Sequence, residues 1–270
     1  MSAVHAIDTA QPALVLEHVA VHFGGLIAIA DMSFTVYEGE VVSLIGPNGA
    51  GKTTAFNVVT GFMRPTQGTV KYRGTALTTL KPHQVAELGL VRTFQRSSVF
   101  QTVTVFENVM IGLHRRGESR LWDTLLALPN ERRSERKLRE RAAEILASVG
   151  IEHRAHDLAG SLAYGDQRLL GVAMALAADP SMLLLDEPVS GMNATETGRF
   201  MELLARLRRG GMTILLVEHD MPMVMGVSDR IVVLNYGRII AEGPPDDIQG
   251  NPEVIRAYLG EGVKKRARGS

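Results

Sequence analysis

Residues 46–53 of this 270-residue chain read GPNGAGKT, which fits the pattern G-x-x-x-x-G-K-[ST] between an apolar run and a helical pattern. Glycines there let backbone N–H groups curve around phosphate oxygens, and the start of the helix adds a favourable partial charge. Lys52 would reach the β- and γ-phosphates of a nucleotide, and the Thr53 hydroxyl would bind Mg²⁺. The alternative is a flexible glycine turn. The predicted phosphate loop consists of Gly46, Pro47, Asn48, Gly49, Ala50, Gly51, Lys52, Thr53 and Thr54.

An acidic pair follows another apolar run, LLLDEP (183–188). Asp186 is placed to hold Mg²⁺ through water, and Glu187 is placed to polarise an attacking water molecule. A water-activating carboxylate distinguishes hydrolysis from transfer to a substrate hydroxyl. An Asp-Glu pair after a strand is often only a surface turn, but the phosphate loop upstream favours the catalytic interpretation.

His219 ends the run TILLVEH (213–219). In an open α/β sheet, the C-terminal end of a strand borders the ligand crevice, so this side chain is placed to contact the γ-phosphate. A single histidine there is more often structural. The phosphate loop and the acidic pair reverse that preference.

The elements that must position these residues alternate between strands and helices. The runs 14–23 and 33–39 alternate apolar and polar residues, whereas 40–46 is more continuously apolar and predicts a strand buried on both faces. Further strand signals lie at 68–74, 181–188, 212–220 and 230–243. Strands separated by helices predict a parallel sheet with crossovers, and the middle of the chain, 96–165, is then a helical insertion.

Two helices are expected in this insertion. Thr104 and Glu107 have the spacing of a capping box, so a helix begins there. Residues 131–150 carry both charge signs, with opposite charges four residues apart, which indicates an exposed helix face rather than a nucleic-acid arm. The apolar seam of this helix consists of Leu138, Ala142, Ile145 and Leu146.

Composition excludes several classes of protein. Hydrophobic residues make up 45% and charged residues 21%, and the 29 basic and 29 acidic side chains cancel, so no net charge attracts nucleic acid or a membrane. The absence of cysteine rules out disulfides and thiolate metal sites. The N-terminal residues lack the pattern of a secretion signal, and the apolar runs are shorter than the roughly 18 residues of a membrane span. We therefore expect a cytoplasmic protein whose membrane spans, if it needs any, belong to other chains.

Taken together, these motifs resemble the ATP-binding subunits of ABC transporters over residues 14–260. The family's marks appear in order: Phe23, GPNGAGKT, Gln95 in LVRTFQ, LAYGDQ (162–167), LLLDEP and His219 in VEHD. The resemblance implies that Phe23 contacts adenine and that Gln95 senses Mg²⁺ and the attacking water. It also implies that two such subunits close head to tail, so that ATP lies between one phosphate loop and the partner's signature. The signature residues are Ala163, Tyr164, Gly165 and Asp166.

The resemblance implies a P-loop NTPase (RecA-like) α/β core with an N-terminal antiparallel β portion and an inserted helical subdomain. We expect one ABC ATP-binding domain over residues 1–270. Its core and β portion would comprise 14–95 and 166–245, its helical subdomain 96–165, and its C-terminal helix and basic tail 246–270. The implied cofactors are ATP and Mg²⁺, with Thr53, Gln95 and Asp186 at the metal.

Within the family, GGLIAIADMSF, LAYGDQR and NPEVIRAYLG are most similar to the subunits of branched-chain amino-acid importers. The implied partners are a second ATP subunit, two membrane permeases and, indirectly, an extracytoplasmic binding protein, with this chain on the cytoplasmic side of the inner membrane. Transporters of urea, amides and other amino acids are similar. A soluble ABC-type ATPase acting on DNA or ribosomes is the alternative of another class, and the neutral charge is against it.

The signature departs from the family's usual Leu-Ser-Gly-Gly-Gln. The serine hydroxyl, which would donate to the partner's γ-phosphate, is missing at Ala163, and Asn193 stands where the family has aspartate. Asp166 is expected to cap its own helix, because a carboxylate would repel phosphate. The backbone N–H groups near Gly165 are then left to bind the phosphate.

Overall fold

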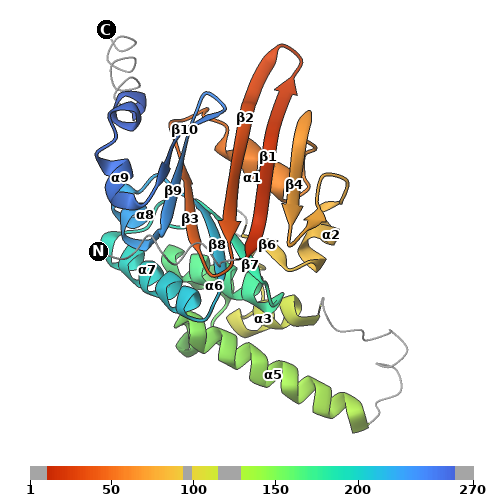
Figure 1. Ribbon diagram of the computed structural model, residues 1–270. Helices are drawn as coiled ribbons and strands as arrows, with labels where there is room; N and C mark the ends of the chain where they lie inside the picture. Colours follow the sequence, from red (N-terminus) through yellow and green to blue (C-terminus); the bar gives the residue numbers. More distant parts are fainter. Residues whose placement is uncertain (1–10, 94–98, 115–128, 259–270) are drawn as a thin grey trace. The chain divides into compact units, whose positions relative to one another are not determined.

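The structure, a computed structural model, describes residues 11–93, 99–114 and 129–258 (Figure 1). It contains two compact units. The sheet unit draws on the ranges Met1–Arg92, Ser181–Ser190 and Leu204–Ser270, and the helical unit on Thr93–Pro180 and Gly191–Leu203. The range 96–165, for which the sequence predicts a helical subdomain, lies within the helical unit.

One ten-stranded sheet organises the sheet unit, with the strand order β5-β4-β1-β2-β10-β9-β3-β8-β7-β6. The strands are β1 (Pro12–Phe23), β2 (Leu26–Tyr37), β3 (Val41–Ile45), β4 (Gln67–Tyr72), β5 (Thr75–Ala76), β6 (Leu90–Arg92), β7 (Met182–Asp186), β8 (Thr213–Val217), β9 (Arg230–Asn235) and β10 (Arg238–Gly243). This mixed architecture confirms the predicted α/β core with an antiparallel portion.

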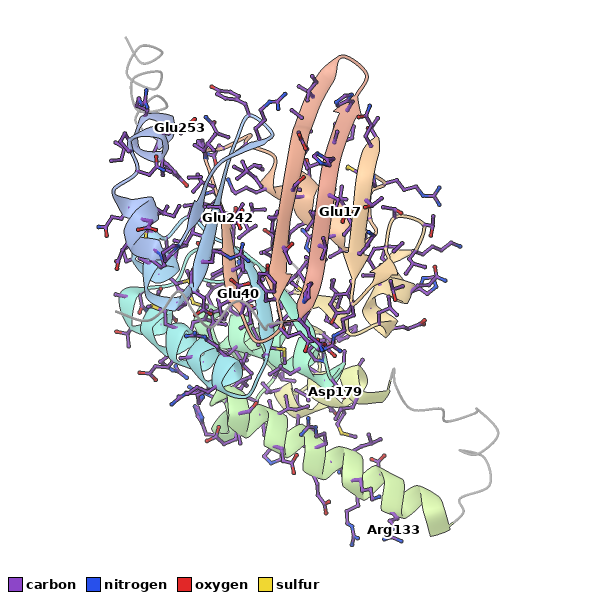
Figure 2. All side chains as sticks on the ribbon, viewed as in Figure 1. Glu17, Glu40, Arg133, Asp179, Glu242 and Glu253 are labelled. Carbon is purple, nitrogen blue, oxygen red and sulfur yellow. The ribbon has the colours of Figure 1, made fainter. Side chains whose placement is uncertain are left out.

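The antiparallel portion is a long hairpin of β1 and β2, with β4 along the other edge of β1 (Figure 1). The sequence predicted the second strand only from residue 33, but β2 already begins at Leu26. The pairing of Leu26 with Phe23 extends the strand through exposed residues that carry no strong alternating signal. Glu17 on β1 is labelled in Figure 2, and its Oε2 atom lies 2.9 Å from Nζ of Lys71 on β4. The hydrogen bonds from Lys71 and Thr69 lower the pKa of Glu17.

The parallel portion runs in the order β9-β3-β8-β7-β6. Every residue of β3, β7 and β8 is buried, and for β3 this confirms the prediction made from the continuous apolar run 40–46. Because these strands are parallel, their C-terminal ends lie at one edge of the sheet and their N-terminal ends at the opposite edge. The residues of the predicted site that follow β3, β7 and β8 therefore share one edge.

Short helices complete the sheet unit: α1 (Lys52–Val59), α2 (Pro82–Glu87), α8 (Met221–Val227) and α9 (Pro245–Gln249). Phe56 and Val59 of α1 belong to the main core cluster together with Leu44 and Leu215. The helix α8 begins after Asp220, whose carboxylate accepts a hydrogen bond from the Met223 N–H at 2.9 Å.

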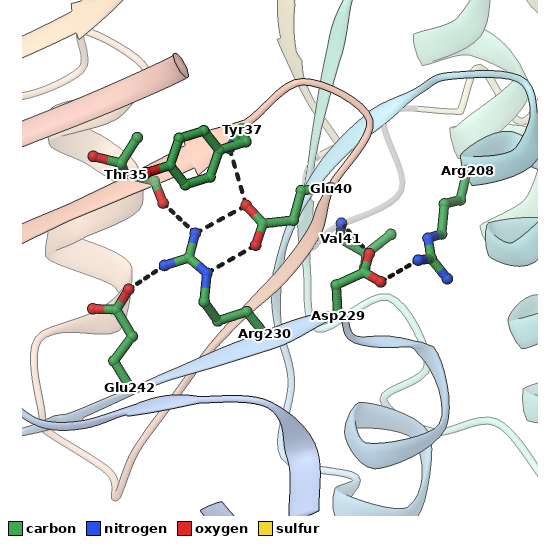
Figure 3. A network of polar contacts seen from close by, with 8 residues as sticks. All are labelled: Thr35, Tyr37, Glu40, Val41, Arg208, Asp229, Arg230 and Glu242. Carbon is green, nitrogen blue, oxygen red and sulfur yellow. Dashed lines mark hydrogen bonds and ion pairs between the residues drawn. The ribbon is translucent and has the colours of Figure 1, made fainter. Parts of the chain in front are cut away.

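The N-terminal ends of the parallel strands carry a network of ion pairs (Figure 3). Arg230, the first residue of β9, donates to both carboxylate oxygens of Glu40, at 2.8 and 2.9 Å. It also contacts Glu242 and the carbonyl oxygen of Thr35. Burial lowers the pKa of Arg230, but the hydrogen bonds and negative charges of Glu40 and Glu242 outweigh burial and raise it. This edge of the sheet is therefore held by charges that pair with one another.

The helical unit contains α3 (Val105–His114), α5 (Pro129–Val149), α6 (Tyr164–Ala177) and the start of α7 (Ala194–Arg209). The capping box of α3 is confirmed. The Thr104 N–H donates to the Glu107 carboxylate at 2.7 Å, and the Glu107 N–H donates to the Thr104 hydroxyl at 3.2 Å. Hydrogen bonds from the backbone and side chain of Thr104 lower the pKa of Glu107.

The charged helix α5 packs against α3 and α6. Its apolar seam is confirmed at Ala142, Ile145 and Leu146, which are buried, whereas Leu138, also predicted for the seam, is half-buried. The predicted pairs of opposite charge also form. Oε1 of Glu135 lies 3.0 Å from Nε of Arg139, and Oε1 of Glu140 lies 3.7 Å from Nε of Arg136. None of the helices described by the structure is both long and apolar enough to cross a bilayer.

Candidate active site

The predicted phosphate loop connects β3 to α1. Gly46 and Gly51 have φ angles of 152° and 110°. A Cβ atom would lie 2.0 Å from the Leu234 carbonyl oxygen at Gly46 and 2.6 Å from the Ala28 carbonyl oxygen at Gly51, so neither position accepts a side chain. A Cβ atom at Gly49 would meet nothing within 4 Å. The loop is thus held tightly against β9 and β2 at its two ends, with an open middle.

Lys52, the first residue of α1, is buried beside this loop. Its Nζ donates to the carbonyl oxygens of Gly46 at 2.6 Å and Pro47 at 2.9 Å, so the ammonium group lies along the backbone of the loop. Thr53 is exposed and Thr54 is half-buried in the first turn of α1. The loop therefore combines an ammonium group, a helix N-terminus and an accessible hydroxyl, which are the groups that bind a phosphate and its metal.

The acidic pair lies at the C-terminal end of β7. Asp186 is the last residue of the strand and is 2% exposed. Glu187 follows with a φ angle of 47°, a left-handed conformation that is rare for a residue with a side chain. The Glu187 N–H donates to the Val217 carbonyl oxygen of β8 at 2.8 Å, and this bond holds the turn. Such strain is of order 1–3 kcal/mol and occurs most often at functional sites.

Glu187 and His219 lie together, although 32 residues separate them. The Oε1 atom of Glu187 is 2.9 Å from Nε2 of His219, and both side chains are partly exposed. The contact arises because β7 and β8 are neighbours, with Asp186 opposite Val217. The structure thus brings the two predicted residues into hydrogen-bond distance.

Glu218, which precedes His219, was missed by the sequence analysis. Its carboxylate is 3% exposed and accepts three backbone hydrogen bonds, from Val189 at 3.0 Å, His219 at 2.6 Å and Asp220 at 3.2 Å. These bonds fix the turn that carries His219 and the segment that follows Glu187. The signal in the sequence was an acidic residue at the end of an otherwise apolar strand.

Arg92, the last residue of β6, was also missed. Its Nη2 donates to Oδ2 of Asp186 at 2.6 Å, and its Nη1 donates to Oδ1 of Asn57 in α1 at 2.8 Å. The guanidinium also lies over the Phe56 ring, 5.5 Å from its centre. A basic residue at the edge where parallel strands end was the available signal.

The residues present fit a magnesium ion. Thr53 and Asp186 offer a hydroxyl and a carboxylate, the hard oxygen ligands that Mg²⁺ takes alongside phosphate oxygens and water. Among the described residues, no cluster of three or more histidine, cysteine or acidic side chains forms a metal site complete in itself. A hydroxyl and a single carboxylate are donors of the kind that bind Mg²⁺ together with the phosphates of a nucleotide.

Phe23 and Gln95 are the other residues predicted for the nucleotide site. Phe23 ends β1 and is 48% exposed, so its ring is accessible for stacking. Gln95 lies outside the described residues. Phe23, the phosphate loop, Asp186, Glu187 and His219 all belong to the sheet unit.

The signature lies at the start of α6, in the helical unit. The prediction that Asp166 caps this helix is wrong. The N-cap residue is Ala163, which makes no side-chain capping bond, and Asp166 lies inside the first turn. Its buried carboxylate instead contacts Arg199 of α7 at 3.5 Å and Arg154 at 3.9 Å. Asp166 therefore faces two arginines from other segments of the helical unit rather than the N-terminus of its own helix.

The rest of the signature packs against the segment that begins α7. A Cβ atom at Gly165 would lie 2.7 Å from Oε1 of Glu196, and one at Gly191 would lie 3.2 Å from the ring of Tyr164. Asn193 forms a capping box with Glu196. The Glu196 N–H donates to the asparagine Oδ1 at 3.0 Å, and the Asn193 N–H donates to the glutamate Oε2 at 2.9 Å. The Asn-x-x-Glu spacing was visible in the sequence but was not used.

Comparisons with known proteins agree with this geometry. The profile of the family "ABC transporter" matches residues 29–190, and that of "Branched-chain amino acid ATP-binding cassette transporter" matches residues 238–264. The chain is 47% identical over 252 residues to the high-affinity branched-chain amino acid transport ATP-binding protein LivG of Escherichia coli K12, covering 93% of this chain and 99% of the relative. It is 44% identical to BraF of Pseudomonas aeruginosa, a protein with the same description, over the same shares.

Solved structures are similar as well. The ADP conformation of an ATP-binding cassette of an ABC transporter matches with a TM-score of 0.81 and 32% identity, covering 93% of this chain and 99% of that chain. A dimeric cassette in a post-hydrolysis state, bound to ADP and phosphate, matches with a TM-score of 0.72 and 26% identity over 86% of this chain and 98% of that chain.

Proposed function

The chain belongs to the ABC transporter family, and we propose that it is the ATP-hydrolysing subunit of an importer for branched-chain amino acids. Membership confirms the resemblance found in the sequence and the predicted ATPase fold. The branched-chain substrate is supported by the functions of LivG and BraF and by the family profile matched at residues 238–264. The observation that carries ATP hydrolysis is the contact of Glu187 with His219, one strand away from the strand that leads into the phosphate loop.

In this proposal the sheet unit binds ATP. Backbone N–H groups of the phosphate loop and the ammonium group of Lys52 hold the phosphates, and the exposed ring of Phe23 stacks on the adenine. Thr53 and Asp186 would hold Mg²⁺, which would supply positive charge to the phosphates. The resemblance adds Gln95 as a further contact to Mg²⁺ and water.

Glu187 orients and polarises the attacking water from its position directly after β7, where its backbone is left-handed. His219 holds that carboxylate by a hydrogen bond and faces the γ-phosphate. Glu218 keeps His219 in place by accepting its backbone N–H. The ends of the neighbouring strands β7 and β8 thus carry three roles. Glu187 activates the water, His219 orients Glu187, and Glu218 supports His219.

The assembly that we propose contains two ATP subunits and two membrane permeases. An extracytoplasmic binding protein is an indirect partner of this chain. The dimeric cassette among the similar structures supports a pair of subunits. In that pair, residues Ala163–Asp166 at the start of α6 would meet the partner's ATP. The chain would act as a peripheral subunit on the cytoplasmic face of the inner membrane.

Replacing the proposed base tests this function. In the assembled transporter, we expect Glu187→Gln to reduce ATP hydrolysis by about 10² or more, the scale of general-base catalysis, while ATP affinity stays unchanged. Uptake of labelled leucine should fall together with hydrolysis. The measurement is phosphate release and uptake in proteoliposomes, with the exposed Glu253→Gln as the control that changes neither.

Hydrolysis near the wild-type rate in Glu187→Gln would contradict the assigned role. The substrate has its own criterion. If wild-type hydrolysis is stimulated by urea or amides and not by leucine, isoleucine or valine, the branched-chain assignment is wrong and the ATPase assignment stands.

A further inference from the structure

Arg92 joins three elements of the sheet unit at the predicted metal site. It ends β6, pairs with Asp186 at the end of β7 at 2.6 Å, and donates to Asn57 of α1 at 2.8 Å. The same helix α1 begins with Lys52 and Thr53. One guanidinium therefore connects the acidic strand to the helix that follows the phosphate loop.

The burial of this pair makes its charge important. The side chain of Arg92 is 11% exposed and that of Asp186 is 2% exposed. A carboxylate so deeply buried needs a compensating positive charge, and a guanidinium stays charged at every accessible pH. Arg92 therefore compensates Asp186 permanently and engages one of its two oxygens, Oδ2.

Arg92 does not depend on Asp186 for its own position. The hydrogen bond to Asn57 and the contact with the Phe56 ring hold the guanidinium from the α1 side. Its Nε atom, in contrast, is buried without a hydrogen-bond partner among the residues that the structure describes. A buried donor without a partner costs stability.

We propose that Arg92 is a positioning residue that acts through Asp186 and sets how strongly the site depends on Mg²⁺. This inference rests on the proposed function, because Mg²⁺ is expected there with ATP. The guanidinium and the metal share one carboxylate. The fixed positive charge lowers the affinity of the site for Mg²⁺, and the guanidinium engages only Oδ2 of Asp186. Without Arg92, Mg²⁺ alone would compensate the buried carboxylate.

The test compares Arg92→Met with wild type in the purified full chain. Melting temperature is followed at a fixed ATP concentration while Mg²⁺ is titrated, which requires no turnover. We expect the Mg²⁺ concentration at half-effect to be at least about tenfold lower in Arg92→Met, as expected when a unit charge is lost within a few ångström of a partly buried site. The rise in melting temperature produced by Mg²⁺ should also be larger than in wild type.

Three further variants make the result specific. Arg92→Lys keeps the charge and should titrate close to wild type. Asn57→Ala leaves the ion pair but loosens Arg92, and should shift the half-effect in the same direction by a smaller factor. Arg230→Met, which removes an equally buried arginine from the other edge of the sheet, should leave the Mg²⁺ titration unchanged.

An unchanged Mg²⁺ titration in both Arg92→Met and Asn57→Ala would overturn the proposal and reduce Arg92 to a structural ion pair. A weaker dependence on Mg²⁺ in these variants would overturn it as well. If Arg92→Met does not fold, the Mg²⁺ titration of Asn57→Ala alone tests the proposal. If wild type itself gains no stability from Mg²⁺ and ATP, the proposed function has failed instead, so the two failures are distinguishable.

Discussion

The parallel strands of the sheet unit carry one half-buried arginine at their C-terminal ends and another at their N-terminal ends, and the two arginines are bound differently. At the N-terminal ends, Arg230 uses all three of its nitrogens, on Glu40, Glu242 and the Thr35 carbonyl oxygen (Figure 3). At the C-terminal ends, Arg92 binds Asp186 and Asn57 but leaves a buried Nε without a partner in the described part of the chain. The burial of the two side chains is nearly the same, 13% and 11% exposed.

The difference indicates two purposes. At the N-terminal edge, carboxylates and cations satisfy one another, which favours stability. At the C-terminal edge, Glu187 has a strained backbone and its carboxylate contacts the partly exposed His219, so this pair remains open to solvent, as a ligand site requires. This division agrees with the rule that ligands of open α/β sheets bind beyond the C-terminal ends of the strands.

The largest effect on stability is expected from Arg230→Met. It would leave the Glu40 carboxylate, 12% exposed, without its counter-charge, and breaking a buried pair in this way destabilises by about 3–5 kcal/mol. Denaturant unfolding measures the loss. The exposed pair of Arg73 with Glu38 gives the matched control, because Arg73→Met should change the free energy of unfolding by less than about 1 kcal/mol.

Below its unfolding transition, Arg230→Met should bind ATP as wild type does. Equal losses of stability in Arg230→Met and Arg73→Met, or a loss of ATP binding in folded Arg230→Met, would break the distinction between the two edges.

At the C-terminal edge of the parallel strands, we expect Glu218→Gln to lower the free energy of unfolding by less than Arg230→Met does. The amide can accept with only one of its two terminal atoms, so at least one of three charge-assisted backbone bonds is lost, at about 1.5–3 kcal/mol. Because those bonds support His219, the variant should also hydrolyse ATP more slowly in the assembled complex. Loss of stability with full hydrolysis would show that Glu218 serves the fold alone.

Much of the fold was predictable from the sequence. The continuous apolar runs that became β3, β7 and β8, the capping box at Thr104 and the helix over 131–150 all carry strong local patterns. The early start of β2 at Leu26 was not predictable in this way, because strand pairing with β1 and not burial extends it.

The site was predictable to the extent that a motif encoded it. The phosphate loop, Asp186, Glu187 and His219 were each placed by strand-end position, and parallel strands put them at one edge. Arg92 and Glu218 were missed because their roles come from partners far along the chain, at 94 residues for Asp186 and 29 for Val189. Asp166 was misjudged for the same reason, since Arg199 lies 33 residues away.

The most direct test of the central claim, that the C-terminal edge of the parallel strands binds the phosphates of ATP, is the ATP affinity of Lys52→Ala measured by titration calorimetry. The ammonium group lies against the loop carbonyl oxygens of Gly46 and Pro47. Losing a charge-assisted hydrogen bond of about 1.5–3 kcal/mol should weaken ATP binding by roughly 10- to 100-fold. An affinity equal to that of wild type would contradict the assignment of ATP to this edge.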